Sequence, residues 1–239
     1  MVINKINKKN AKPLAISISV IFVTIFFLGH ICNIKIGDER FFIMCKEVEI
    51  SNNTGYDEAE LKKLAYFPLL DEVWYKNYNM SDIDWISGLN PKVKKCHVSG
   101  SYNKFNIEAL NDTSIEYIFF DRLNIDDFTD AHDNRTIKEI ITWYYDGANL
   151  NGIENFKALE NLYLANAHKI TNCDALKECS ELKEVSLVQC DLLEDYSSFL
   201  EIPKLEYLCV DEGALREEEI KALEDKGVRI AFNKYEPQG

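Results

Sequence analysis

Leu159-Glu-Asn-Leu-Tyr-Leu164 recurs twice downstream, with similar residues at the same places, as Leu182-Lys-Glu-Val-Ser-Leu187 and Leu205-Glu-Tyr-Leu-Cys-Val210. The shared template has apolar residues at its first, fourth and sixth positions. Five further copies lie upstream, with these positions at Ile137/Ile140/Thr142, Ile115/Ile118/Phe120, Val93/Cys96/Val98, Leu70/Val73/Tyr75 and Cys45/Val48/Ile50. The fourth positions of the eight copies are 48, 73, 96, 118, 140, 162, 185 and 208, which are 25, 23, 22, 22, 22, 23 and 23 residues apart. A fixed period of this length is typical of a solenoid in which each repeat forms one coil.

The pattern resembles the leucine-rich repeat family, whose unit reads L-x-x-L-x-L-x-x-N/C-x-L, and the resemblance runs from about Phe42 to Phe232. Its period is most similar to that of the bacterial internalin-type class. The resemblance implies an α/β fold, a solenoid with a curved parallel sheet on its concave face and short helical turns on its convex face. The family's Asn/Cys position departs from the pattern in most copies, where it holds Tyr78, Ser101, Leu123, Tyr145, Ala167 and Gly213. The asparagine ladder that ties neighbouring coils together in the family is therefore largely missing.

An apolar pair with a separation of three residues follows most of the template copies. This separation puts both side chains on one face of a helical turn. The pairs are Leu61/Leu64, Ile86/Leu89, Ile107/Leu110, Ile153/Phe156, Cys173/Leu176, Tyr196/Phe199 and Ile220/Leu223. The connection from Asn124 to Arg135 has only Phe128 as an apolar anchor, so we expect an irregular or mobile loop there.

The domain boundaries follow from these patterns. We expect a solenoid of about eight repeats over residues 42–214, with Phe41 to Met44 shielding the open edge of its first coil. Residues 215–239 are predicted to be a carboxyl-terminal cap and tail, with a helix over 215–227 and a ninth strand over 228–232.

The amino terminus carries a membrane-anchor pattern. Residues 13–34 contain no charged side chain, and the apolar run from Leu14 to Leu28 is part of a segment about long enough to cross a bilayer. Basic residues precede it, at Lys5, Lys8, Lys9 and Lys12. We therefore expect a cytoplasmic basic tail over 1–12, a transmembrane signal-anchor helix over 13–34 and a linker over 35–41. This predicts a single-pass protein of the cell membrane with its repeats on the extracytoplasmic side.

A cleaved signal peptide, which would release the repeats as a secreted protein, is the alternative for the same segment. It calls for small residues before the cleavage site, but Phe27 occupies that place if cleavage follows Gly29.

Composition excludes several classes of function. A net charge of −13 argues against nucleic acid as a partner, because phosphate binding needs clustered lysine and arginine. No nucleophile or metal motif stands out, so we predict no catalytic residues, no cofactor and no metal. A calcium site at Asp126, Asp127, Asp130 and Asp133 is conceivable, although the spacing matches no standard loop. The seven cysteines do not form a disulfide framework, although a bridge between Cys173 and Cys179 stays open.

The candidate site comes from the template positions that point away from the core. The fifth position gives Glu49, Trp74, His97, Phe119, Ile141, Tyr163, Ser186 and Cys209 along the sheet, and the seventh adds Trp143. Contiguous exposed aromatic side chains are typical of interaction sites. We therefore predict a non-enzymatic module that binds an unidentified protein through Trp74, His97, Phe119, Ile141, Trp143 and Tyr163.

Three alternatives accompany this prediction. The aromatic side chains could simply stack along the sheet and support it. The same stripe also suits the rings of a carbohydrate or cell-wall glycan, and the chain could be a scaffold or accessory subunit with no ligand of its own. Separately, the second template positions alternate in charge, which predicts a stabilising surface ladder across neighbouring strands. These positions are Lys46, Asp71, Lys94, Glu116, Lys138, Glu160, Lys183 and Glu206.

Overall fold

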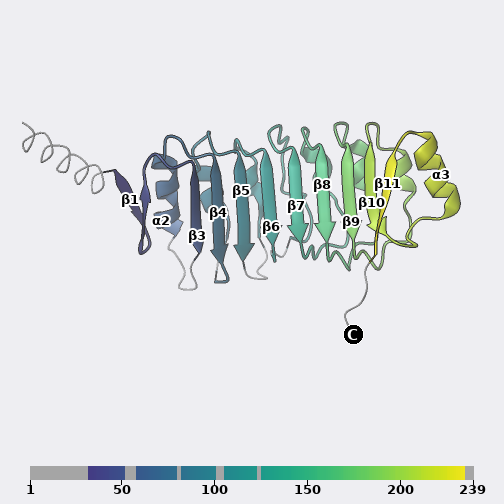
Figure 1. Cartoon of the computed structure of the whole chain (residues 1–239), viewed down its shortest axis with the longest axis horizontal. Coiled ribbons are helices and arrows are strands. Elements are labelled where there is room, and N and C mark those ends of the chain that lie inside the picture. The colour runs from purple at the N-terminus through teal and green to yellow at the C-terminus, as the bar shows by residue number, and fades with distance from the viewer. Residues whose placement is uncertain (1–31, 52–57, 80–81, 101–104, 123–124, 235–239) are drawn as a thin grey trace, which may run out of the picture.

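A long parallel sheet dominates the computed structural model, which describes residues 32–51, 58–79, 82–100, 105–122 and 125–234. Nine strands of the described residues lie side by side in chain order (Figure 1). They are β3 (Glu47–Ser51), β4 (Glu72–Asn77), β5 (Lys95–Gly100), β6 (Tyr117–Asp121), β7 (Glu139–Trp143), β8 (Asn161–Ala165), β9 (Glu184–Val188), β10 (Tyr207–Asp211) and β11 (Arg229–Asn233). The predicted solenoid with one strand per coil is confirmed, whereas the curvature of its sheet stays a prediction.

The strands pair in the register that the template predicts. Val48 is opposite Val73 at one end of the sheet, and Leu162 lies between Ile140 and Val185 in the middle. Side chains of a strand alternate between the two faces, so the fourth and sixth template positions all enter the core. Thr142 is the polar exception among them, and it is fully buried.

Helical turns lie behind the sheet in the view of Figure 1 and close most of the coils on the side opposite the open face. They are α2 (Glu58–Leu61), η1 (Lys62–Tyr66), η2 (Asp84–Gly88), η3 (Ile107–Leu110), η4 (Ile153–Asn155), η5 (Asp174–Glu178), η6 (Ser197–Leu200) and α3 (Glu217–Asp225). Most are single 3₁₀ turns, in which residues three apart lie over one another. The predicted apolar pairs therefore point together into the core, as Ile107 and Leu110 do.

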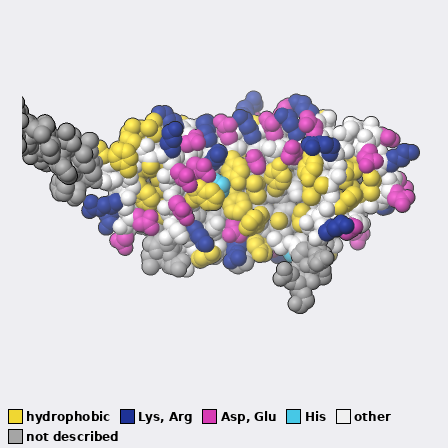
Figure 2. All heavy atoms as spheres, viewed as in Figure 1, with side chains coloured by type: hydrophobic (Ala, Val, Ile, Leu, Met, Phe, Trp, Pro, Cys, Tyr) yellow, Lys and Arg dark blue, Asp and Glu magenta, His cyan; other side chains and the backbone are white. Residues whose placement is uncertain are grey.

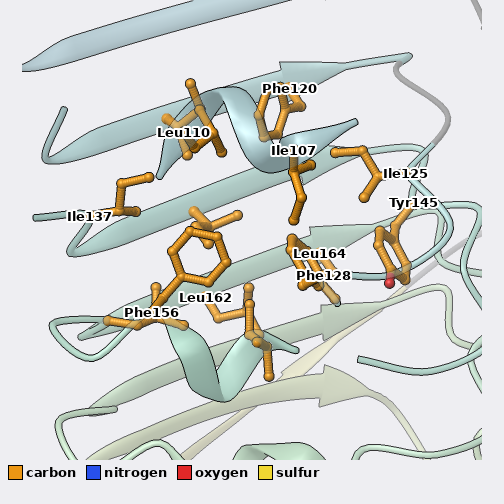
Figure 3. Packing of buried hydrophobic residues seen from close by; sticks show 14 of the residues in the cluster. Ile107, Leu110, Phe120, Ile125, Phe128, Ile137, Tyr145, Phe156, Leu162 and Leu164 are labelled. Atoms are coloured by element: carbon orange, nitrogen blue, oxygen red, sulfur yellow. The ribbon is translucent and has the colours of Figure 1, made fainter. Parts of the chain in front are cut away.

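One continuous core fills the space between the sheet and these turns. Figure 3 shows Phe156 close to Leu162, with Phe128 near Tyr145 and Leu164 in the same layer. The rings of Phe128 and Tyr145 are stacked with centroids 5.7 Å apart, and Phe128 meets Phe156 edge to face at 6.0 Å. Such aromatic pairs add about 0.5–1.5 kcal/mol each beyond the area they bury.

The connection between β6 and β7 is irregular, as predicted, since its described residues contain no helix. It is nevertheless well packed, because Ile125 and Ala131 are buried together with Phe128. The buried Asn134 side chain donates a 2.8 Å hydrogen bond from Nδ2 to the carbonyl of Leu110 in the preceding coil. This bond ties the irregular coil to its neighbour.

Backbone hydrogen bonds replace the missing asparagine ladder. Arg122, Tyr144 and Asn166 follow successive strands in the left-handed conformation, with φ of 58°, 67° and 54°. Their N–H groups donate to the next strand, at the carbonyls of Trp143, Ala165 and Val188. The Tyr145 hydroxyl, at the ladder position itself, donates a 2.7 Å hydrogen bond to the carbonyl of Asn149 within its own coil. The sheet therefore stays regular without the asparagines.

The alternating charges at the second template positions form part of the expected ladder. Glu116 lies between two lysines, 3.3 Å from Lys94 and 2.7 Å from Lys138, and Lys183 lies 2.6 Å from Glu160. Figure 2 shows the alternating colours along the upper edge, above the starts of the strands. Each such exposed pair contributes about 0.2–1 kcal/mol, so the ladder supports the stack without dominating it.

A hairpin closes the amino-terminal end of the solenoid. β1 (Asn33–Ile36) and β2 (Glu39–Phe42) pair antiparallel, where the sequence predicted the end of the anchor and the linker over 35–41. Ile36 is fully buried, because the hairpin folds back on the first coil and covers its open edge. The shielding role predicted for Phe41 to Met44 therefore belongs to a larger element that begins at Asn33.

The membrane prediction falls mainly on residues that the structure does not describe. Residues 1–31 lie outside the described part, which includes the basic tail and most of the predicted anchor. In the part that is described, no helix combines the length and the apolar character needed to cross a bilayer.

The carboxyl-terminal end of the solenoid consists of a helix followed by a strand. Helix α3 covers the last coil, and Gly227 follows it in the left-handed conformation with φ of 86°, which allows a helix to end there. Strand β11 then adds parallel to β10, one residue later than predicted. Residues 235–239 lie outside the described part.

Candidate functional site

The open face of the sheet, opposite the helical turns, carries three rows of side chains. The upstream row holds the third template positions: Glu47, Glu72, Lys95, Tyr117, Glu139, Asn161, Glu184, Tyr207 and Arg229. The middle row holds the fifth positions: Glu49, Trp74, His97, Phe119, Ile141, Tyr163, Ser186, Cys209 and Ala231. The downstream row holds the seventh positions, among them Lys76, Asp121 and Trp143. Figure 2 shows hydrophobic side chains gathered across the middle of this face.

The six predicted site residues lie together on strands β4 to β8. Trp74 and His97 stack with ring centroids 3.4 Å apart and planes 4° from parallel. His97 and Phe119 follow at 5.9 Å, and Phe119 meets Trp143 edge to face at 5.3 Å. Ile141 and Tyr163 continue the middle row. These six residues are called the aromatic cluster below.

The members of the aromatic cluster differ in exposure. Trp143 and Trp74 are the most open, with 51% and 39% of their surfaces exposed. Phe119, Ile141 and Tyr163 are half-buried. His97 is only 7% exposed, which differs from the prediction of an exposed histidine. The indole of Trp74 covers the imidazole, so that His97 supports a contact residue more than it offers a contact itself.

Glu72 fixes this stacked pair. Its Oε1 atom accepts a 2.9 Å hydrogen bond from Trp74 Nε1 and lies 2.9 Å from His97 Nε2. Burial lowers the pKa of His97, and the hydrogen bond to Glu72 opposes that shift. A neutral imidazole with its proton on Nε2 satisfies the contact. The arrangement therefore holds Trp74 in one orientation before any ligand arrives.

Carboxylates and tyrosines of the upstream row border the aromatic cluster. Tyr117 lies 5.0 Å from His97 between ring centroids, and Tyr163 donates a 2.7 Å hydrogen bond to Glu184 Oε2. Burial raises the pKa of Glu139, and the nearby Glu184 charge adds to the effect. Sequence reasoning missed Glu72, Glu139 and Glu184, although the third template positions could have been read as a row in the same way.

Tyr144 extends the site downstream of Trp143. It is exposed, and the Arg122 guanidinium lies 5.7 Å from its ring centroid, within the range of a cation–π contact. The left-handed backbone at Tyr144 turns the chain here, so consecutive residues of one coil both present aromatic rings. The exposed surface therefore continues past the edge of the sheet.

Other potentially reactive groups lie away from this face or are unreactive. Burial raises the pKa of Cys179 and of Cys190 to about 12, so both thiols stay protonated at neutral pH. Cys173 and Cys179, the pair left open as a bridge, are both free. Within the described ranges, no three His, Cys, Asp or Glu side chains are placed to hold a metal ion. That statement includes the aspartates of the calcium alternative, one of which, Asp133, pairs with Arg135 at 2.9 Å.

A separate cavity of about 510 Å³ opens beside the charged ladder. Its walls are Lys46, Leu69, Leu70, Asp71, Pro91, Lys92 and Lys94. The Lys92 side chain lines this cavity, and its Nζ atom donates a 2.8 Å hydrogen bond to the carbonyl of Pro68. None of the predicted site residues lines this cavity.

Comparison with known proteins gives resemblances of fold. No protein-family model and no curated protein matches the chain. An internalin (inlF) of Listeria monocytogenes is 14% identical, with a TM-score of 0.48 over 74% of this chain and 59% of that chain. Internalin C2 of the same organism is 17% identical, with a TM-score of 0.41 over 67% of this chain and 87% of that chain. The chain thus spans under two thirds of the first structure.

Proposed function

We propose that the protein is a non-enzymatic binding module that holds a protein partner against the aromatic cluster on the open face of its solenoid. The observation that carries the proposal is the half-exposed pair of tryptophans, Trp74 and Trp143, in contact with one continuous set of rings. Large apolar side chains exposed in one patch mark interaction surfaces on soluble domains. Tryptophan and tyrosine are also the residues most enriched at binding hot spots.

The arrangement of Trp74 supports binding for a second reason. A side chain that is ordered only on binding costs about 0.5–1.5 kcal/mol of affinity. The bond to Glu72 and the stack on His97 fix the indole beforehand, so this cost is already met in the free protein. A pre-organised exposed ring is expected of a contact residue.

We further propose that the module is attached to the membrane through the part of residues 13–34 that precedes strand β1, with its amino end in the cytoplasm. The support is the uncharged apolar segment and the lysines before it. Because β1 starts at Asn33, the anchor would run almost directly into the hairpin that closes the solenoid. The coils would then lie close to the membrane surface.

A glycan is the second candidate ligand. The observation in its favour is that rings and carboxylates occur in bonded pairs, Trp74 with Glu72 and Tyr163 with Glu184. A sugar ring can stack on the aromatic side chain while its hydroxyl groups donate to the carboxylate. The alternative predicts competition by soluble oligosaccharide, whereas a protein complex should resist it.

The test is a pull-down from detergent-solubilised membranes with the full chain. Trp74→Ser combined with Trp143→Ser should abolish recovery of a partner that the wild type captures. The matched control is Tyr66→Ser with Leu192→Ser, because these side chains are 69% and 54% exposed but lie off the open face. Circular dichroism of the wild type and the two double variants checks that each protein folds. Equal loss in both variants, or no loss in either, would reject the open face as the binding surface.

A further inference from the structure

The upstream row places two carboxylates between two tyrosines at the centre of the open face. Adjacent strands pair Tyr117 with Glu139, Glu139 with Asn161, Asn161 with Glu184, and Glu184 with Tyr207. Neighbouring strands are about 4.8 Å apart, so the backbones of Glu139 and Glu184 are separated by roughly 10 Å. Asn161 lies between them. The hydroxyl of Tyr163, in the middle row, bonds to Glu184 from the side.

Among the described residues, the cations that contact this row lie toward its two ends. At one end Lys95 Nζ lies 3.8 Å from Glu72, and at the other the Arg229 guanidinium lies 5.5 Å from the ring centroid of Tyr207. In the part of the chain that the structure describes, neither Glu139 nor Glu184 forms an ion pair. Their hydrogen bonds come from uncharged groups, the Asn161 amide and the Tyr163 hydroxyl.

The environment of these carboxylates favours a cation from outside. Partial burial disfavours the charge of Glu139, and the neighbouring negative charge of Glu184 adds to that penalty. A lysine or arginine side chain between them would offset the repulsion and complete their hydrogen bonds. The tyrosine rings beside them suit such a cation as well, as the contact of Arg229 with Tyr207 shows at the end of the same row.

From this charge complementarity we propose that the partner is a protein with a basic segment, one of whose lysine or arginine side chains binds between Glu139 and Glu184. The inference rests on the proposed function, because it assumes that the partner occupies the open face. It identifies the chemistry that the partner presents there. The net charge of −13 adds long-range attraction for such a segment.

The test uses the full chain in detergent and a phage library of short random peptides as the probe. Peptides selected on the wild type should be enriched in lysine and arginine. Their binding should be at least about ten-fold weaker with Glu139→Gln combined with Glu184→Gln, because charge-assisted hydrogen bonds are lost. The matched control is Glu206→Gln with Glu224→Gln, which removes the same charge at exposed carboxylates elsewhere and should leave affinity nearly unchanged. Selected peptides remade with citrulline for arginine, or norleucine for lysine, should lose affinity for the wild type to a similar extent.

The outcomes separate this inference from the proposed function. Peptides that need Trp74 and Trp143 but bind equally well to the Glu139/Glu184 variant would overturn the basic-segment proposal and leave the open face in place. Equal weakening by both carboxylate variants would also overturn it, because the effect would then reflect overall charge. Peptides that bind the Trp74/Trp143 variant as well as they bind the wild type would reject the proposed function itself.

Discussion

Strands β4 to β7 and strands β9 to β11 share one backbone plan but present different side chains on the open face. In the first region, the middle row consists of Trp74, His97, Phe119 and Ile141. In the second, it consists of Ser186, Cys209 and Ala231. Both regions pair in parallel with continuous register, so small side chains suffice to hold the sheet. The rings of the first region are therefore not needed to hold the sheet together, which leaves them for the proposed ligand.

The largest predicted effect concerns what the two regions have in common, the buried rows behind the sheet. Leu162 and Leu208 are both fully buried at equivalent template positions. An uncompensated carboxylate at either place should lower the free energy of unfolding by at least about 4 kcal/mol. Leu162→Asp and Leu208→Asp should therefore unfold most of the solenoid, measured by urea denaturation. An unchanged denaturation midpoint for either variant would show that its leucine does not enter the core and that the strand register is wrong.

The second prediction separates the two regions by binding. Trp143→Ala should weaken partner affinity about ten-fold or more, which is about 1.4 kcal/mol or more, because a half-exposed tryptophan contributes strongly at an interface. Ser186→Ala, at the small-residue end of the same face, should leave affinity within about two-fold. Surface plasmon resonance with the captured partner measures both. The comparison fails if the serine variant loses as much affinity as the tryptophan variant.

The third prediction uses pH to examine the stacked pair in the aromatic region. Burial lowers the pKa of folded His97 below its ordinary value of 6.5. Above that pH both folded and unfolded states are neutral there and His97 contributes no pH dependence. As the pH falls below about 6.5 the unfolded state binds the proton first, so stability is lost. Between pH 7.5 and 5.5 the wild type should therefore lose more stability than His97→Gln, measured by urea denaturation at each pH. Parallel pH dependence of the two proteins would show that His97 is not held neutral.

The smallest predicted effect is a gain in stability at the central carboxylate. Burial raises the pKa of folded Glu139, so the charged form is disfavoured at neutral pH and the folded state binds a proton more readily than the unfolded one. Glu139→Gln should therefore raise the thermal midpoint slightly at pH 7, measured by differential scanning calorimetry. The gain should shrink as the pH falls through the folded pKa and vanish below the ordinary value of 4.5, where the side chain is protonated in both states. A lower thermal midpoint for Glu139→Gln at pH 7 would indicate that the charged side chain stabilises the free protein. Glu139 would then not need a cation from a partner.

The sequence was sufficient for the elements that repeat. Positions such as Ile140, Leu162 and Val185 recur at a nearly constant period, and a solenoid leaves one register that buries all of them. The placement of the aromatic cluster follows from that register, because the side chains between buried positions must face outward. The six residues could therefore be brought together without any structure.

Features that do not repeat could not be predicted from the repeat pattern. His97 is buried by a neighbouring ring, and a row pattern does not show which of two adjacent side chains covers the other. The hairpin from Asn33 to Phe42 occurs once, and its start is continuous with an apolar segment. The sequence therefore predicted the end of an anchor and a linker in its place. The carboxylates Glu139 and Glu184 gain significance only from the burial and hydrogen bonds around them.

Site-specific photo-crosslinking in cells tests the central claim most directly. Benzoylphenylalanine would be placed at Ile141, in the aromatic region, or at Ala231, in the same row on β11. We predict that the probe at Ile141 gives a crosslinked protein adduct that disappears in the Trp74→Ser, Trp143→Ser background, while the probe at Ala231 gives none. An adduct from Ala231 alone, or one from Ile141 that survives both tryptophan substitutions, would contradict the assignment of the aromatic cluster as the binding surface.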